Sequence, residues 1–367
     1  MKLKLGISFL VLLAFILSCK EEVKVLRIGA LIPQSGTLEA YGRNVKNGLM
    51  LALNQINDMG GVNGKKLDII FEDDGSDEKI AVEKANALIK QGVPVIIGGV
   101  TSNVALAIAP VCESNKVVLL SPSASSPKLT KAGSYVFRNY PSDSLEGKIM
   151  AEYAVRHMKI KSVAVLYIDN DYGQGLMDVF NDTFTGIGGE ITIQKSFTQG
   201  QTDFAAIVKE VKGRPSDAVY IIGYYTEIAG ILHELKKQKV ESKIISVEGV
   251  AQPIILEIAA EDAEGLVYPQ PPYSPDSPDA AIQKFVSSYR AKYGTKPDID
   301  AAFSYDALRI VAKAIEKCQK YPVDLRDRMA DTGMRGLAGD ITFDSNGDVD
   351  ITPKMFQIQG GKFVPLE

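Results

Sequence analysis

The sequence contains no tryptophan and only two histidines, His157 and His233. Both histidines fall inside amphipathic helical patterns, and no His, Cys and Asp residues cluster at metal-ligand spacing, so we expect no metal site. The sequence also lacks a G-x-S-x-G elbow, a P-loop and a G-x-G-x-x-G motif. These absences predict a protein that is not an enzyme and that holds no cofactor.

Two short matches to a serine-enzyme motif leave one alternative open. Ser-x-x-Lys occurs at Ser76–Lys79 and at Ser125–Lys128, but the partner motifs S-D-N and K-T-G are absent. A serine hydrolase that uses Ser125 as its nucleophile is therefore the enzymatic alternative.

The sequence has no excess of basic residues and no long hydrophobic run. Its 41 Lys and Arg against 45 Asp and Glu give a formal net charge of −4, which argues against a nucleic-acid partner. The longest apolar run, Leu5–Leu17, is about 13 residues long and is too short to span a bilayer. Because Lys2 and Lys4 precede it, the run predicts the core of a signal peptide.

Cysteine is also scarce, with three residues in the chain. Ile16-Leu17-Ser18-Cys19 resembles the bacterial lipobox, in which the cysteine is lipidated and becomes the first mature residue. We expect residues 1–18 to be a signal peptide and 19–24 to hold the lipidated Cys19 and a tether, which would anchor the protein to a membrane. Cys112 and Cys318 are compatible with a disulfide or with two buried thiols.

From Val25 onward, short β-branched runs alternate with amphipathic helical stretches, the pattern of parallel sheets covered by helices. The pattern restarts after Pro141, so we expect an α/β protein with two doubly wound lobes joined by a hinge that the chain crosses several times. The segment from Tyr268 to Tyr273 is interpreted as a stiff connector. Two helices follow, and two short strands joined through Asn346-Gly347 end the chain. We assign residues 25–139 and 273–331 to the first lobe, and 140–272 and 332–367 to the second.

Small polar residues follow two neighbouring strands of the first lobe. Gly98-Gly99-Val100-Thr101-Ser102 leads from a strand into a helix, and Ser121-Pro122-Ser123-Ala124-Ser125 follows the next strand. Hydroxyl and backbone N–H groups at a helix N-terminus bind anions. Taken together, the two loops favour a carboxylate site over two unrelated turns or caps.

Motifs along nearly the whole chain resemble the periplasmic branched-chain amino-acid-binding family, the leucine/isoleucine/valine-type receptors of ABC transporters. Each motif is short, but their order and spacing are specific. They include Gln34-Ser35-Gly36, Gly60-Gly61-Val62-Asn63-Gly64, Leu120-Ser121-Pro122-Ser123-Ala124, Asp171-Tyr172-Gly173-Gln174-Gly175, Gly223-Tyr224-Tyr225 and Glu248-Gly249.

This resemblance implies a type I periplasmic binding fold and a set of ligand-binding residues. Ser102, Ala124 and Ser125 would bind the ligand's α-carboxylate and part of its ammonium, and Glu248 would pair with the ammonium. The resemblance also implies aromatic contacts from Tyr41, Tyr172, Tyr224, Tyr225 and Phe303. The chain departs from the pattern in having Tyr41 where the family often has Trp, and Thr101 rather than Cys beside Ser102, so the side-chain pocket is expected to differ.

The sequence therefore predicts a monomeric, lipid-anchored receptor outside the cytoplasm that delivers a small amino acid, branched-chain or otherwise apolar, to an ABC-type permease. A receptor for an amide, urea or aromatic acid, and a ligand sensor without transport, are the alternatives.

Overall fold

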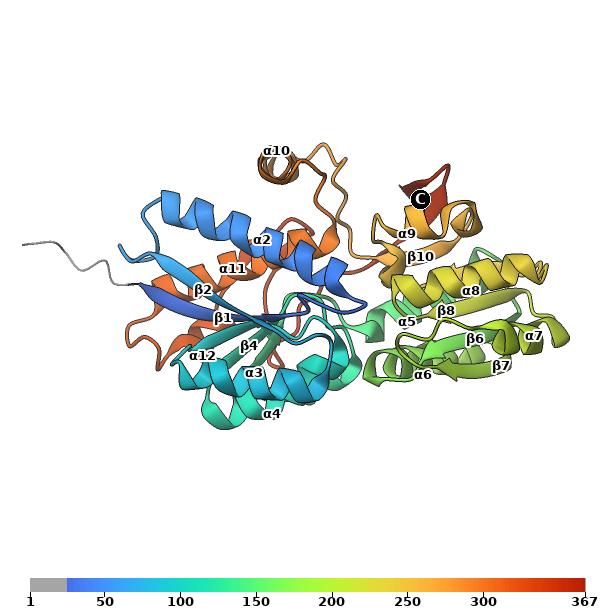
Figure 1. Cartoon of the computed structure of the whole chain (residues 1–367), viewed down its shortest axis with the longest axis horizontal. Helices are drawn as coiled ribbons and strands as arrows, with labels where there is room; N and C mark the ends of the chain where they lie inside the picture. Colours follow the sequence, from blue (N-terminus) through green and yellow to red (C-terminus); the bar gives the residue numbers. More distant parts are fainter. Residues whose placement is uncertain (1–24, 367) are drawn as a thin grey trace, which may run out of the picture.

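The computed structural model describes residues 25–366 and contains two α/β lobes that lie end to end (Figure 1). The signal peptide, Cys19 and the tether predicted from the sequence lie outside the described residues. Within the described part of the chain, no helix is both long enough and apolar enough to cross a membrane. The predicted fold class, two doubly wound lobes of mainly parallel sheet, is confirmed.

The first lobe is built on a five-stranded sheet with strand order β2-β1-β3-β4-β5, in which all neighbours are parallel. Its central strands are fully buried because helices cover both faces, which explains their uninterrupted Val, Ile and Leu runs. The strands are β1 (Leu26–Ile32), β2 (Leu67–Asp73), β3 (Val95–Gly98), β4 (Val118–Ser121) and β5 (Val136–Arg138).

Helices from distant parts of the chain cover this sheet. One face carries α2 and α11, which pack against each other, and the other carries α3 and α4 (Figure 1). The two helices predicted after Pro272 thus add to the first lobe and form no third domain. The helices are α2 (Glu39–Asp58), α3 (Glu78–Lys90), α4 (Ser102–Asn115), α10 (Ala280–Tyr293), α11 (Ile299–Lys317) and α12 (Leu325–Ala330), with a short 3-10 helix η1 (Pro127–Lys131).

The second lobe contains a seven-stranded sheet with order β14-β13-β10-β9-β8-β6-β7. Strands β6 to β10 are parallel, β13 pairs antiparallel with β10, and β14 pairs antiparallel with β13. The strands are β6 (Ser162–Ile168), β7 (Glu190–Phe197), β8 (Ala218–Ile222), β9 (Lys243–Ser246), β10 (Val267–Gln270), β13 (Lys354–Gln359) and β14 (Lys362–Pro365).

The helices of the second lobe pack in pairs, with α5 on α6 and α7 on α8. They are α5 (Asp143–Arg156), α6 (Asp171–Gly186), α7 (Ala205–Gly213), α8 (Tyr225–Lys237) and α9 (Ile255–Ile258), with short 3-10 helices η2 (Glu248–Val250) and η3 (Ala260–Ala263).

The predicted connector at Tyr268–Tyr273 is wrong in its first half, because residues 267–270 form strand β10. Proline lacks an N–H donor and is usually excluded from a strand inside a sheet. Pro269 is accommodated because β10 pairs with β9 only at Val267, so no ladder on that side needs its N–H. The other side of β10 pairs with β13.

The segment that begins at residue 332 also differs from its predicted assignment to the second lobe. Strands β11 (Met334–Arg335) and β12 (Asp340–Ile341) pair with each other, and the backbone N–H of Leu337 donates to Asp306 of α11. The Asn346-Gly347 turn joins Phe343 to Val349, not β12 to β13. The chain therefore returns to the second lobe only after Asp348, because these residues find their partners on the first lobe.

Candidate functional site

A small cavity between the lobes brings together residues from both sheets. It has a volume of about 30 Å³, room for two or three water molecules, since one water needs roughly 10–15 Å³. It is lined by Tyr41, Val100, Thr101, Ser102, Ser123, Ala124, Ser125, Tyr172, Tyr224, Glu248 and Gly249.

The cavity lies where the strand order of each sheet reverses direction. In the first lobe this point is between β1 and β3, and in the second it is between β6 and β8. Parallel α/β sheets bind ligands at such points, beyond the carboxyl ends of their strands. Each lining residue lies in a loop or helix start that follows a strand end, so the topology alone explains their convergence.

The loop after β3 needs glycine to pass close to β1. A Cβ atom on Gly98 would lie 2.0 Å from the carbonyl oxygen of Leu31, so any residue with a side chain would clash with β1 at this position. This close approach brings the start of α4, with Thr101 as its N-cap and Ser102 as its first residue, to the edge of the cavity. Thr101 makes no side-chain cap hydrogen bond, so the helix N-terminus presents its N–H groups without a side-chain acceptor.

The hydroxyl of Ser102 is held by the neighbouring loop. Its Oγ accepts hydrogen bonds from the backbone N–H groups of Ser125, at 3.3 Å, and Ser126, at 3.1 Å. A hydroxyl has two acceptor lone pairs and one donor hydrogen. Since both lone pairs are occupied, Ser102 is left as a hydrogen-bond donor, the role that an anionic group requires.

Two further serines tie the loops after β3 and β4 together. Ser121 Oγ donates to the carbonyl of Gly99 and accepts the N–H of Ala124, and Ser123 Oγ donates to the carbonyl of Val100. The donors of the first lobe are thus fixed in advance, which reduces the entropy lost on binding.

The second lobe supplies aromatic walls. Asn170 caps α6 by accepting the N–H groups of Tyr172 and Gly173, and this cap fixes the start of the helix that carries Tyr172. The ring of Tyr172 stacks on Tyr224 with centroids 5.5 Å apart, and Tyr224 meets the edge of Tyr41 from the other lobe at 6.1 Å.

Glu248 supplies the only carboxylate among the lining residues, opposite the serine loops. It begins η2 just after β9, and its backbone N–H donates to Glu146 at 3.1 Å. Burial raises the pKa of the Glu248 carboxyl and the nearby acids Asp298 and Asp143 add to this, while a hydrogen bond with Tyr140 lowers it, and the resulting pKa is about 7. A carboxylate in this setting is stabilised by a positively charged partner.

More acids lie behind Glu248. Burial raises the pKa of Asp143 to about 7, and burial together with the charges of Asp143 and Glu248 raises the pKa of Glu146 well above its ordinary value. The second-lobe side of the cavity is therefore strongly electronegative once these groups ionise.

Seven of the nine ligand-binding residues expected from the sequence line the cavity, namely Tyr41, Ser102, Ala124, Ser125, Tyr172, Tyr224 and Glu248. Tyr225 and Phe303 do not. The Tyr225 hydroxyl donates to the carbonyl of Thr37 across the lobes, and Phe303 packs on Tyr140 with ring centroids 4.8 Å apart.

Val100, Thr101, Ser123 and Gly249 also line the cavity and were not singled out as ligand-binding residues. Thr101, Ser123 and Gly249 are direct neighbours of predicted site residues and Val100 is two residues from Ser102, so extending each loop by two residues would have found them. The acids behind Glu248 and the buried Arg138 carried no such signal, because their partners lie far away in the sequence.

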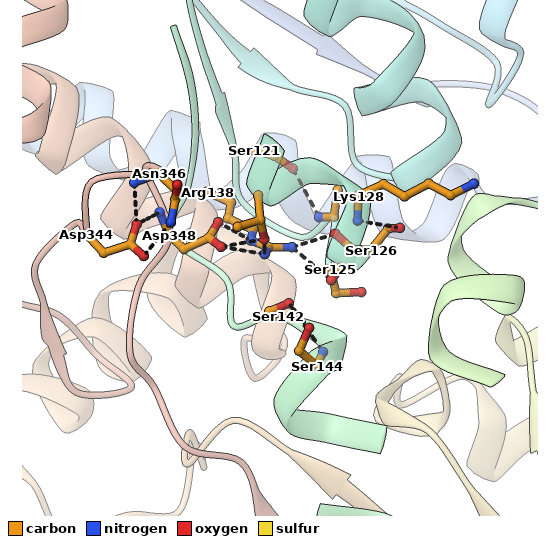
Figure 2. Close-up of polar contacts among 12 residues, drawn as sticks. Ser121, Ser125, Ser126, Lys128, Arg138, Ser142, Ser144, Asp344, Asn346 and Asp348 are labelled. Atoms are coloured by element: carbon orange, nitrogen blue, oxygen red, sulfur yellow. Dashed lines mark hydrogen bonds and ion pairs between the residues drawn. The ribbon is translucent and has the colours of Figure 1, made fainter. Parts of the chain in front are cut away.

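The geometry does not support serine chemistry at Ser125. The Lys128 ammonium forms an ion pair with Asp171, and Figure 2 shows the Lys128 side chain directed away from Ser125. Within residues 25–366, no three His, Cys, Asp or Glu side chains are placed to hold a metal ion, and Cys112 and Cys318 are both free thiols.

Comparison with known proteins is consistent with this geometry. The family model described as periplasmic binding protein matches residues 25–362. The leucine-, isoleucine-, valine-, threonine-, and alanine-binding protein of Pseudomonas aeruginosa is 28% identical over 332 residues, which cover 90% of this chain and 87% of that protein.

Two solved structures extend the comparison. The leucine-binding protein LivK of Thermotoga maritima is 30% identical with a TM-score of 0.88, covering 93% of this chain and 98% of its own. The branched-chain amino acid transporter substrate-binding protein LivJ of Streptococcus pneumoniae, in complex with isoleucine, is 30% identical with a TM-score of 0.86, covering 94% and 99%.

Proposed function

The chain belongs to the periplasmic binding protein family, and from this premise we propose that it is a receptor that closes its two lobes around one apolar amino acid. A branched-chain amino acid is the preferred ligand. The relatives named above bind such amino acids, and the cavity contains the complementary groups that a zwitterion needs.

The observation that carries this proposal is the polarity of the cavity. Its first-lobe wall offers the Ser102 hydroxyl as a donor together with the N-terminus of α4, where anions are favoured. Its second-lobe wall offers the Glu248 carboxylate. An α-amino acid carries a carboxylate and an ammonium on adjacent positions, so it can bridge the two walls and draw them together.

The remaining walls favour a modest apolar side chain. Tyr41, Val100 and Ala124 line the cavity beside the donor groups, and all three are buried. Thr101 adds a hydroxyl whose oxygen has no hydrogen-bond partner among the described residues. A small polar side chain such as that of threonine is therefore accommodated alongside valine, leucine and isoleucine.

The family and the lipobox-like residues Ile16-Leu17-Ser18-Cys19 support the proposed setting of the protein. The protein acts outside the cytoplasm, with Cys19 lipidated and the preceding residues removed. Closure of the lobes would present the loaded form to an ABC-type permease. The ligand leaves chemically unchanged, in keeping with a binding protein.

A thermal-shift panel tests the proposal. Residues 20–367 are unfolded and refolded to remove carried-over ligand, then heated with the twenty amino acids, simple amides, urea and aromatic acids. A ligand at 1,000 times its Kd stabilises the native state by about 4 kcal/mol. We expect the largest shifts from leucine, isoleucine and valine.

The variant Glu248→Gln keeps the shape of the side chain and removes its charge. It should weaken amino-acid binding by roughly 10- to 100-fold, the scale of a charged hydrogen bond. Glu257 is an exposed residue of helix α9, so Glu257→Gln is the matched control and should bind as the parent does. Shifts by amides or aromatic acids alone would contradict the proposed role of Glu248, and no shift by any compound would contradict the receptor function.

A further inference from the structure

Arg138 is a buried cation that lies outside the cavity lining. It ends strand β5 and is 1% exposed. All five of its N–H donors are used. Its Nε and Nη2 donate to the two carboxylate oxygens of Asp348, and Nη2 also donates to Thr130 (Figure 2). A guanidinium held so completely is fixed in position.

The remaining two hydrogen bonds of this side chain are made with the serine loop after β4. Arg138 Nη1 donates to the carbonyl oxygens of Ser125, at 2.8 Å, and Ser126, at 2.9 Å (Figure 2). The Ser125 carbonyl and the Ser126 N–H belong to the same peptide group. That N–H in turn donates to the Oγ of Ser102.

A continuous chain of hydrogen bonds therefore connects the guanidinium to the ligand cavity. It runs from Arg138 through the peptide group between Ser125 and Ser126 to the hydroxyl of Ser102. Hydrogen bonds in series polarise one another. A positive charge at one end makes the Ser126 N–H a stronger donor, and this makes the Ser102 hydroxyl a stronger donor in turn.

The partner of Arg138 comes from the segment in which the chain returns to the second lobe. Asp344 holds a tight turn by accepting the N–H groups of Asn346 and Asp348, and the carbonyl of Gly347 accepts the N–H of Arg138. A Cβ atom on Gly347 would lie 2.4 Å from the carbonyl oxygen of Val136. The Asn346-Gly347 turn thus serves to bring Asp348 against the guanidinium.

We propose that Arg138, held by Asp348, is a positioning residue that sets the carboxylate-binding strength of the cleft through the serine loop and Ser102. This inference rests on the proposed function. Arg138 supplies the positive bias that an anionic group needs, while the cavity wall itself presents only neutral donors. The ligand's carboxylate is then bound without a direct ion pair, so the affinity depends on how the loop is held.

The test compares L-leucine with L-leucinamide by calorimetry in the parent protein, Arg138→Lys and Arg138→Met. Leucinamide keeps the ammonium and the side chain but lacks the carboxylate charge. Lysine keeps the charge but cannot reach all the acceptors of the guanidinium, and methionine removes the charge. We expect the affinity for leucine relative to that for leucinamide to fall by about tenfold or more in the methionine variant, and by less in the lysine variant.

Arg309→Met is the matched control. Arg309 also pairs with a buried aspartate of the first lobe, Asp306, and it makes no contact with the serine loop. Its loss should leave the leucine-to-leucinamide affinity ratio unchanged. A parent protein that binds no amino acid would refute the proposed function, whereas a parent that binds leucine and an unchanged ratio in both Arg138 variants would refute this inference alone.

A double-mutant cycle provides an independent readout that holds even if Arg138→Met fails to fold. If Arg138 acts through Ser102, Arg138→Lys should weaken leucine binding less in the Ser102→Ala background than in the parent. If Arg138 has a purely structural role, the fold-losses of leucine affinity caused by Arg138→Lys and by Ser102→Ala should multiply in the double variant. Multiplying losses would overturn the proposal.

Discussion

At the scale of single residues, the cleft depends on the charge state of Glu248. Its carboxyl lies near Asp143 and Glu146, and burial raises the pKa of all three groups. Three carboxyl groups this close titrate as a group rather than separately. In the ligand-free protein they share protons at neutral pH, and the ammonium of a ligand favours their ionised form.

This coupling predicts that ligand binding strengthens as the pH rises. The pKa of Glu248 is about 7 without ligand, so below that pH the group is protonated and must release a proton before it can pair with an ammonium. The affinity for leucine should fall by up to tenfold per pH unit below about pH 7. Calorimetry between pH 5.5 and 8, in buffers of different ionisation enthalpy, measures both the affinity and the proton release.

Glu248→Gln has no proton to release at this position and provides the control. Its weaker binding should vary less with pH than that of the parent. An affinity that is flat from pH 5.5 to 8 in the parent would contradict the assignment of Glu248 as the partner of the ammonium.

Seven of the nine residues that the sequence predicted to bind the ligand line the cavity, and each of them lies in a loop or helix start that follows a strand end. Tyr225 and Phe303 are different, because their orientation depends on packing. Tyr225 begins α8 and turns to Thr37, while Phe303 faces Tyr140. Neither direction is encoded in local sequence. Arg138 was missed for a related reason, since its partner Asp348 is 210 residues away.

At the scale of secondary-structure elements, close packing at strand ends decides where the site residues lie. Gly173, in the first turn of α6, would place a Cβ atom 2.0 Å from the carbonyl oxygen of Ile168 at the end of β6. Glycine at this position allows the helix to start directly above the strand. The neighbouring Tyr172 is thereby brought to the cavity.

Replacing this glycine should affect both the fold and the site. Gly173→Ala forces α6 away from β6 and is expected to cost about 1–3 kcal/mol of unfolding free energy, with weaker leucine binding because Tyr172 moves. Gly186→Ala, at the other end of the same helix, meets no atom within 4 Å and should be neutral or stabilising by up to about 1 kcal/mol. Denaturant unfolding measures both, and equal stabilities would contradict the close-packing argument.

Periodicity correctly predicted the alternation of strands and helices from Val25 and its restart after Pro141. The errors lie at β10 and in residues 332–349, where long-range pairing decides the outcome. Proline is unfavourable in a strand, so Pro269 indicated a connector. A local pattern cannot show that β10 pairs with β9 only at Val267, which leaves that edge of β10 almost unpaired. The same limit applies to Asp348. We assigned it to the second lobe, but its partner Arg138 belongs to the first.

At the scale of the whole molecule, the two lobes are held together by contacts around the cavity. The Tyr41 hydroxyl donates to the carbonyl of Gly249, Gln252 donates to Asp300, and Lys128 pairs with Asp171. Each contact joins one lobe to the other. Exposed pairs such as Lys128 and Asp171 contribute little, so a ligand that bridges both walls adds a large share of the energy that favours closure.

The central claim is that closure depends on a zwitterion held between donors of one lobe and the acid of the other. Calorimetry of the parent protein with L-leucine and 4-methylpentanoate, its analogue without the ammonium, tests it most directly. We expect leucine to bind tightly and the analogue to bind at least about 100-fold more weakly, since Glu248 would then face no cation and sit beside a ligand of like charge. Comparable affinities would contradict it and would indicate a receptor for simple carboxylic acids.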